Sequence, residues 1–492
     1  MAFGFALCIF FATFAPALEI SEIMKNQSRQ LYILALLPLL LLAMPCKAEL
    51  TPNREQKTNL FALCRGAEEE GKSQLKPLNI AKLDSFFNAV SSQYMGSVAI
   101  SVGGTTVYRH STGYADIQAD IKASEKSKYM IGSISKTFTA ILTFMAVDEG
   151  RLSLDDKLSR FFPDKKLTNA DKITIDNLLY HRSGIHDIFE GEGDYLQWYT
   201  QYQSRDVLIA RIAAAGADTI PDAVQQYCNA GYVLLTFILE DLYGKSYSQL
   251  LQEKLAQPLH LSNTSVGDGI DPLQNECRSY SYKGGWQLEP ETHPSVPQGA
   301  GVLMSNPDDL LKFANALFGN QLGNNILQRM ETINGSLGRG LFPFVFYEKR
   351  GFGHTGGIDG FQSVLCHFDE GNVTVALCSN GNNLNQNDIL ITVLNAVYGK
   401  DYEIPTFNYA VLDAETLNRY VGEYESRDLH MTIKVTTDGK TLTAQAAGQM
   451  AFGLEAENEN TFSFAKAGIK IAFESTNLIL YQAGQKIVFT RK

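Results

Sequence analysis

The clearest helical pattern in the chain lies between residues 129 and 150, which read YMIGSISKTFTAILTFMAVDEG. Apolar side chains recur there at the i, i+3, i+4 and i+7 spacing of a helix with one buried face, namely at Phe138, Ile141, Leu142 and Met145. Gly150 is a typical end for such a helix, because glycine readily adopts the left-handed conformation that closes the last turn. The pattern therefore predicts an amphipathic helix that packs through one face.

Alternating stretches on both sides of this helix predict strands. Residues 96–116 read GSVAISVGGTTVYRHSTGYAD, which indicates a hairpin that turns at Gly103 and Gly104. Three more alternating runs, RGFGHTGG, GFQSVLCHFDE and NVTVALCSNG, predict three strands within residues 350–381. Further helices are expected at 230–243, 307–318 and 387–398. Strands that enclose a helical middle favour an α+β fold, in which one antiparallel sheet is flanked by helices and carries an inserted helical region.

The character of the chain changes near Pro405. From about residue 414 it shows six short alternating runs, separated by turns such as Asp438-Gly439, and this spacing predicts a small antiparallel barrel or sandwich. We therefore divide the chain into five parts. They are a leader at 1–48, a linker with a first helix at 49–78, a main domain at 79–400, a linker at 401–413 and a C-terminal β-barrel domain at 414–492.

The first 48 residues have the composition of a targeting segment. From Met24 the chain reads MKNQSRQ, then the apolar run LYILALLPLLLLAMP, then CKA. A basic start, an apolar run and small residues predict a signal peptide that is cleaved after Ala48 and an exported protein, periplasmic or extracellular. Residues 1–23 hold a second apolar run without a preceding basic residue, so either Met24 is the true start or that run is a membrane segment. Membrane association is expected only through this leader.

Composition narrows the range of partners. The 492 residues are 45% hydrophobic and 19% charged, as in an ordinary soluble protein, and the formal net charge is -11. Phosphate binding needs a basic surface, so nucleic acid is excluded as a partner. Five cysteines lie beyond the leader without a C-x-x-C pair, which signals neither a zinc site nor a disulfide framework, although export would allow one or two disulfides. They are Cys64, Cys228, Cys277, Cys366 and Cys378.

The helix at 129–150 begins with a pair of residues suited to nucleophilic chemistry. Ser133 and Lys136 are three positions apart, so they share one helical face and the amine can reach the hydroxyl. Burial beside an apolar stripe would lower the proton affinity of the amine, which could then act as a base. Ser73 and Lys76 have the same spacing but lie in a charged stretch before Pro77, where nothing would bury the lysine.

Two more segments resemble motifs of a known superfamily. Tyr227-Cys228-Asn229 precedes the helix at 230–243, and His354-Thr355-Gly356-Gly357 lies on a predicted strand. With MIGSISK they resemble the serine β-lactamase and penicillin-binding protein superfamily, whose motifs are S-x-x-K, then Y-x-N or S-x-N, then K-T-G. The Y-x-N form is similar to the class C β-lactamase-like branch. The resemblance covers about residues 80–400, and residues 414–492 resemble the lipocalin-like barrel of many exported members.

The resemblance implies a role for each motif residue. Ser133 would be acylated, and Lys136 and Tyr227 would share its proton, since a phenol beside a cation has a lowered pKa. Asn229, His354, Thr355 and Gly356 would bind the substrate, with the glycine leaving space for it along the strand. The N–H groups of Ser133 and Gly357 would form the oxyanion hole.

Other residues are ambiguous or depart from the family pattern. His181 and His186 lack a third ligand at a suitable spacing, so we expect no metal and treat both as structural or cleft-lining. Tyr195 and Trp198 could line the pocket or simply pack. Cys228 would place a thiol beside the site and be an oxidation liability. His354 replaces the lysine that usually attracts a substrate carboxylate, and a histidine is only partly charged near neutral pH, so that attraction should be weaker and pH-dependent.

The sequence thus predicts an exported serine hydrolase that forms an acyl-enzyme on peptides, amides or esters, of the D-amino-acid peptidase or esterase type, and needs no cofactor. One alternative is a class C-like β-lactamase or a D-alanyl-D-alanine carboxypeptidase. Another is a penicillin-binding sensor that is acylated without turnover. In a third, the C-terminal barrel binds a lipophile and the hydrolase domain is vestigial. The small-molecule or peptide substrate and the oligomeric state stay open.

Overall fold

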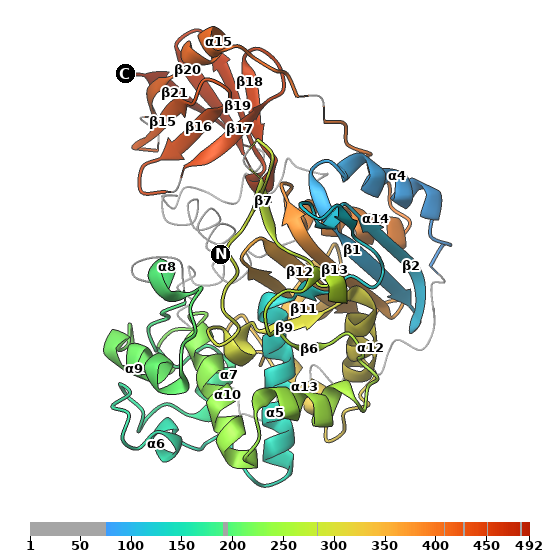
Figure 1. Ribbon diagram of the computed structural model, residues 1–492, viewed down its shortest axis with the longest axis vertical. Helices are drawn as coiled ribbons and strands as arrows, with labels where there is room; N and C mark the ends of the chain where they lie inside the picture. Colours follow the sequence, from blue (N-terminus) through green and yellow to red (C-terminus); the bar gives the residue numbers. More distant parts are fainter. Residues whose placement is uncertain are drawn as a thin grey trace, which may run out of the picture.

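The core of the main domain is a mixed but mainly antiparallel sheet, seen in a computed structural model that describes residues 75–189, 195–282, 284–407, 409–426, 429–449, 451–482 and 485–492 (Figure 1). Its strands lie in the order β10-β11-β12-β13-β1-β2, and the short strands β7 and β8 attach to β13. The bounds are β10 Phe342–Phe346, β11 Lys349–Ile358, β12 Phe361–Phe368, β13 Val373–Asn382, β1 Tyr94–Val102, β2 Thr105–Thr112, β7 Tyr280–Tyr282 and β8 Trp286–Leu288. The predicted hairpin at Gly103 and Gly104 is confirmed as β1–β2.

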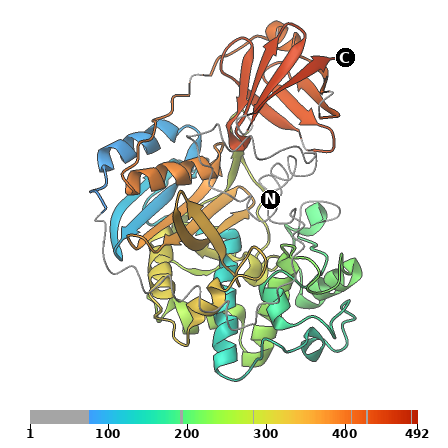
Figure 2. The same ribbon diagram turned by 180° about the vertical axis from the view of Figure 1, so that it is seen from behind.

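Both faces of this sheet are covered by helices (Figures 1 and 2). On one face, α4 (Ile80–Val90) and α14 (Gln386–Val397) pack on side chains such as Val98 and Val375. On the other face, α5 (Ser135–Asp148) and α12 (Pro307–Phe318) share a core with Ala99, Leu365 and Ala376. Successive strand residues thus point to opposite cores, as the alternation of a pleated strand requires.

The helix that follows the S-x-x-K motif is buried more completely than its sequence pattern predicts. In α5 every residue from Ser135 to Phe144 is buried, whereas Met145, one of the predicted core positions, is only half-buried. The reason is the inserted helical region, which encloses the faces of α5 that the sheet leaves open. Its helices are α6 Leu158–Phe161, α7 Ile175–Leu179, α8 Tyr195–Trp198, α9 Arg205–Ala215, α10 Asn229–Tyr243, α11 Tyr247–Leu251 and α13 Ile326–Glu331.

Helix ends follow local signals where the sequence provides them. α12 begins after Asn306, whose side chain accepts a hydrogen bond from Asp309 N, and it starts with Pro307. α10 ends at Gly244 in the left-handed conformation. Short strands complete the domain, namely β3 Tyr114–Asp116, β4 Ile121–Lys122, β5 Tyr129–Met130, β6 Ser265–Val266 and β9 Leu303–Ser305.

The C-terminal part is a closed antiparallel barrel of eight strands, which confirms the predicted barrel. Its strands are β14 Gly422–Ser426, β15 Met431–Thr437, β16 Leu442–Ala446, β17 Phe452–Ala456, β18 Thr461–Phe464, β19 Ile469–Glu474, β20 Asn477–Gln482 and β21 Gln485–Arg491, preceded by α15 Ala414–Asn418. The six predicted runs did not include β14 and β17. Side chains from all eight strands fill the interior, including Tyr424, Leu442, Phe462 and Phe489. This filling argues against a lipophile inside the barrel.

Several expectations for the N-terminal part lie outside the described residues. They are the signal peptide, both candidate start residues, Cys64 and the helix expected at 49–78; within the described chain the first helix is α4, which begins at Ile80. Across the ranges given above, no helix has the length and apolar character of a membrane span. The four described cysteines are buried free thiols, so none of them forms a disulfide with another.

Candidate active site

Ser133 lies in a tight turn between the short strand β5 and helix α5. A 3₁₀ turn, Gly132–Ile134, joins these elements, and Gly132 has a φ of +51°, a conformation that side chains disfavour. Ser133 is partly exposed whereas Gly132 and Ile134 are buried. The turn thus presents one hydroxyl to solvent at the N-terminal end of a buried helix, where backbone N–H groups favour negative charge.

Lys136 has no exposed surface, and its ammonium group lies at the centre of the site. The Nζ atom donates to Ser133 Oγ at 2.9 Å, to Asn229 Oδ1 at 2.8 Å and to the carbonyl oxygen of Ala300 at 2.7 Å. Burial lowers the pKa of this amine to about 7, and the nearby Asp187 acts in the opposite direction. The structure therefore brings the predicted serine and lysine together, with an amine that titrates near neutral pH.

The Tyr-x-Asn segment reaches the same point from the start of α10. The Lys136 Nζ atom lies 4.9 Å from the centroid of the Tyr227 ring. That ring stacks on His181 with centroids 4.4 Å apart. His181 is buried, and its Nδ1 accepts a hydrogen bond from Cys228 N at 3.0 Å, so the histidine supports the segment as a structural residue. His186 is exposed and binds Asp218 at 2.8 Å, away from this cluster.

His354 lies on β11 as a buried and neutral residue, which corrects the expectation of partial charge. Its Nδ1 atom faces the carbonyl oxygen of Thr355 at 2.5 Å, so that nitrogen carries the proton. The ring stacks on Phe342 with centroids 4.1 Å apart. Burial, with a further contribution from the nearby Lys136 charge, lowers the pKa of His354 to about 3. No pH-dependent attraction of a carboxylate can arise here near neutrality.

Gly356 lies in close contact with the turn that carries Ser133. A Cβ at this position would lie 2.0 Å from the carbonyl oxygen of Ile131 and 2.3 Å from Ser363 Oγ. Ser363 Oγ donates to that same carbonyl at 2.8 Å. Gly356 therefore lets β11 pack against the turn that carries Ser133. A Cβ on Gly132 would similarly lie 2.7 Å from Gly357 N, so the Gly357 backbone borders the serine turn.

The structure also places four other residues that the sequence analysis singled out. Cys228 is buried, and burial raises the pKa of its thiol, which removes both the access and the thiolate that oxidation requires. The predicted oxidation liability is therefore wrong. Tyr195 and Trp198 are buried and pack edge to face with centroids 5.0 Å apart. Thr355 is partly exposed on β11, on the opposite side from His354 and Gly356.

Two polar groups of the site were not found from the sequence. Asp187 accepts hydrogen bonds from Asn229 N and Asn229 Nδ2, both at 2.7 Å. The Ala300 carbonyl, in the 3₁₀ turn Gln298–Ala300, binds Lys136. Asp187 lies 42 positions from Asn229, so no local sequence pattern links the two residues. The Ala300 group is a backbone carbonyl, which has no signature in the sequence.

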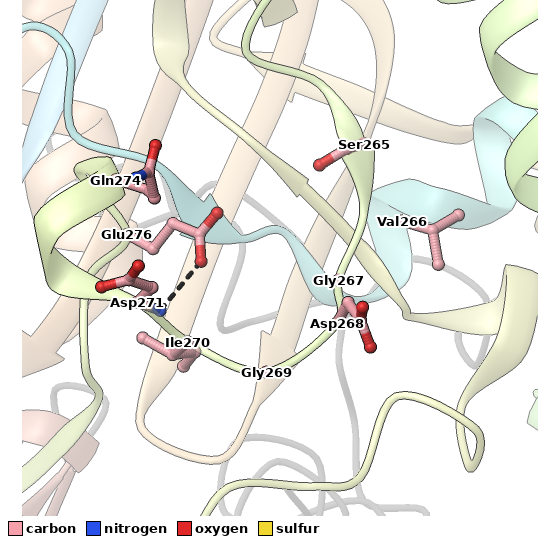
Figure 3. Close-up of a pocket in the computed structure, with 9 residues that line it drawn as sticks. All are labelled: Ser265, Val266, Gly267, Asp268, Gly269, Ile270, Asp271, Gln274 and Glu276. Carbon is pink, nitrogen blue, oxygen red and sulfur yellow. Dashed lines mark hydrogen bonds between the residues drawn. The ribbon is translucent and has the colours of Figure 1, made fainter.

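None of the residues of this cluster lines the cavity shown in Figure 3. It has a volume of about 380 Å³ and is lined by residues 265–271 with Gln274 and Glu276. The Asp271 N–H group donates to Glu276 Oε2 at 2.9 Å, and Glu276 also pairs with Lys128. None of its lining residues contacts the Lys136 ammonium group by a hydrogen bond.

Comparison with known families agrees with this fold. The family model described as Beta-lactamase matches residues 87–400, which is more than half of the chain. The protein therefore belongs to the Beta-lactamase family, as the motif resemblance predicted, and it is a serine hydrolase.

Several relatives and solved structures share this similarity. Penicillin-binding protein 4* of Bacillus subtilis is 25% identical over 439 residues, covering 80% of this chain and 94% of that protein. Teichoic acid D-alanine hydrolase of Staphylococcus aureus is 26% identical over 341 residues, covering 66% and 81%. The structure of D-amino acid amidase from Ochrobactrum anthropi aligns with a TM-score of 0.58 and 26% identity, covering 66% of this chain and 99% of that one.

The packing of Gly356 yields a stability prediction. We expect Gly356→Ala to lower the free energy of unfolding by about 1–3 kcal/mol, because the added methyl group forces β11 away from the Ile131 carbonyl. Gly453→Ala on β17 is the matched control, since no atom lies within 4 Å of the Cβ it would add. Urea unfolding measures both. Equal stability of the two variants would contradict the packing role of Gly356.

Proposed function

We propose that the protein hydrolyses amides, peptides or esters through an acyl-enzyme formed at Ser133. The observation that carries this proposal is the 2.9 Å hydrogen bond between Lys136 Nζ and Ser133 Oγ, made by an amine whose pKa burial lowers to about 7. A buried amine that loses its proton near neutral pH can accept the serine proton as a general base.

The reaction proceeds in two steps, acylation of Ser133 and then hydrolysis of the acyl-enzyme. Ser133 Oγ attacks the carbonyl carbon, and its proton passes to Lys136, with Tyr227 sharing the transfer. The bond to the leaving group breaks, and the leaving group takes up that proton. Water then attacks the acyl carbon and gives a proton to the same pair. The ester bond to Ser133 breaks, the acid leaves, and the serine hydroxyl is restored.

Backbone and polar groups around the serine would hold the reacting carbonyl. The N–H groups of Ser133 and Gly357 form the proposed oxyanion hole, supported by the close packing of the Gly132 turn against Gly357. Asn229 and Thr355 are proposed substrate contacts, with the second proton of the Asn229 amide available in addition to the one that Asp187 accepts. His354 is proposed to border the leaving-group side without a charge.

The proposed substrates are D-amino-acid amides, peptides or esters of the kind found in cell-wall material. Teichoic acid D-alanine hydrolase and D-amino acid amidase are similar over about two thirds of this chain. A neutral His354 disfavours a class C-like β-lactamase or a D-alanyl-D-alanine carboxypeptidase, because both act on substrates with a free carboxylate. A penicillin-binding sensor would be distinguished by an adduct that never hydrolyses.

We also propose that the protein is exported, on the basis of the leader that ends at Ala48. The main domain at 79–400 would carry out the reaction and the barrel at 414–492 would be an accessory domain. Hydrolysis by a protein that lacks residues 400–492 would support this division.

Replacing the nucleophile tests the proposal directly. Ser133→Ala should lower turnover of p-nitrophenyl esters and D-amino-acid anilides by about 10⁴-fold or more while the protein stays folded. Mass spectrometry should detect an acyl adduct on Ser133 in the parent protein. Ser91→Ala, which removes an exposed hydroxyl at the end of α4, is the control and should retain full activity. Retained turnover in Ser133→Ala would overturn the assignment.

The pH dependence of kcat/KM should follow the ionisation of Lys136. Neutral Lys136 is the base, so kcat/KM should rise about tenfold per pH unit below pH 7 and level off above it. His354, with a pKa of about 3, should contribute no step between pH 5 and 9. Stopped-flow or steady-state assays with an uncharged ester measure the profile. A curve that is flat from pH 5 to 9 would contradict a base at Lys136.

The charge at position 354 should control the response to a substrate carboxylate. His354→Lys should increase the preference for a peptide with a free carboxylate over its methyl ester by about tenfold, because an ammonium group adds a charge-assisted hydrogen bond. His354→Gln, which stays neutral, is the control and should leave the ratio unchanged. The same ratio in all three proteins would refute the charge argument.

A further inference from the structure

Helix α10 begins without a capping side chain from its own sequence. Cys228 occupies the N-cap position and makes no side-chain cap. Asp187, in the segment that follows α7, supplies a carboxylate instead. Its Oδ2 atom accepts from Asn229 N at 2.7 Å, and Oδ1 accepts from Ala230 N at 3.3 Å. A carboxylate in this place satisfies N–H groups that the helix leaves unpaired.

The same carboxylate oxygen also determines how the Asn229 side chain points. Asn229 Nδ2 donates to Asp187 Oδ2 at 2.7 Å, and on its other side Asn229 Oδ1 accepts from Lys136 Nζ at 2.8 Å. A reversed amide would bring its carbonyl against the carboxylate and its NH₂ group against the ammonium group. Both contacts would be repulsive, so Asp187 fixes the orientation that gives Lys136 an acceptor.

Asp187 is also the nearby negative charge for the lysine. The imidazoles of His181 and His354 face the Lys136 amine from the α7 side and from β11, and burial keeps both neutral by lowering their pKa. The amine also lies near the rings of Tyr227 and Tyr232 and the Cys228 thiol, which come from α10 and the segment just before it. Burial raises the pKa of Tyr232 and Cys228, so those two groups are neutral as well. Burial also raises the pKa of the Asp187 carboxyl, and the hydrogen bonds from Asn229 lower it.

We infer that Asp187 is a positioning residue that acts on Lys136 through the amide of Asn229. This inference rests on the proposed acyl transfer at Ser133 and assigns to it a group 42 positions before Asn229 in the chain. Within the described part of the chain, Asp187 accepts hydrogen bonds from Asn229 and Ala230, and no hydrogen bond joins it to Ser133. It orients the amide, and its charge favours the protonated form of the amine.

The first test is Asp187→Asn, assayed with an uncharged ester. We expect kcat to fall by about 10- to 100-fold, since a small misplacement of a reacting group has an effect of that size, while KM changes little. The acid limb of the kcat/KM profile should also move to lower pH, because removal of a nearby negative charge lowers the pKa of Lys136. A purely structural role would lower activity without moving that limb.

Asp218→Asn is the matched control. Asp218 lies in the neighbouring segment and binds His186 and Gln226 rather than Asn229. Its substitution should leave both kcat and the limb unchanged.

A double-mutant cycle with Asn229→Ala gives the decisive result. If Asp187 acts through the amide, Asp187→Asn should lower kcat by less than about threefold in the Asn229→Ala background, where that amide is absent. The effect of Asp187→Asn on helix stability should persist in that background as a lowered Tm. Equal losses in both backgrounds would overturn the inference. Asp187→Glu, which keeps the charge near the helix start, replaces Asp187→Asn in the same cycle if the latter does not fold.

Failure of this inference is distinguishable from failure of the proposed function. Full activity in Asp187→Asn together with an inactive Ser133→Ala would reject the positioning role and leave the acyl-enzyme in place. Undiminished turnover in Ser133→Ala would reject both.

Discussion

A buried ammonium group must be surrounded by acceptors, and this requirement organises the main domain. Lys136 is fully enclosed, and leaving its N–H groups unpaired in such a place would cost several kcal/mol. Its three protons are satisfied by Ser133, Asn229 and the Ala300 carbonyl, which come from three different elements. The turn before α5, the start of α10 and the 3₁₀ turn Gln298–Ala300 therefore have to meet at one point. The sheet and the inserted helices hold them there.

Two opposing effects set the pKa of that ammonium group. Burial lowers the pKa of Lys136, and Asp187 counteracts part of the effect. Both nearby imidazoles stay neutral because they are buried too. The amine thus titrates near 7, where a general base is most effective in a neutral medium. A charged residue at position 354 on β11 would shift the pKa of Lys136. The neutral state of His354 is therefore part of what sets the lysine pKa.

Local features of the site and fold were predictable from the sequence. Ser133 and Lys136 are three positions apart, so helical geometry alone brings them together. The helix at 307–318 was predicted to the residue because Asn306 and Pro307 mark its start. The barrel was predicted from alternation, although β14 (GEYES) and β17 (FGLEA) contain too few apolar positions to stand out.

What could not be predicted depends on contacts between distant parts of the chain. His354 is neutral because it is buried and stacks on Phe342. The residues next to it in the sequence do not reveal that burial. The close packing of Gly356 could not be predicted either, because the Ile131 carbonyl that it lies against comes from a distant part of the chain. Asp187 reaches Asn229 only because the segment after α7 folds back over the start of α10.

The order of strands in the main sheet also affects how copies of the protein meet one another. The six-strand run of this open sheet ends in β10 and β2, and the unpaired backbone groups of such outer strands could template pairing with another chain. Pro343 is exposed on β10 and has no N–H group to offer an incoming strand. On β2, Arg109 forms an ion pair with Asp308 of α12. These two features discourage edge-to-edge aggregation, while the barrel, being closed, has no edge to protect.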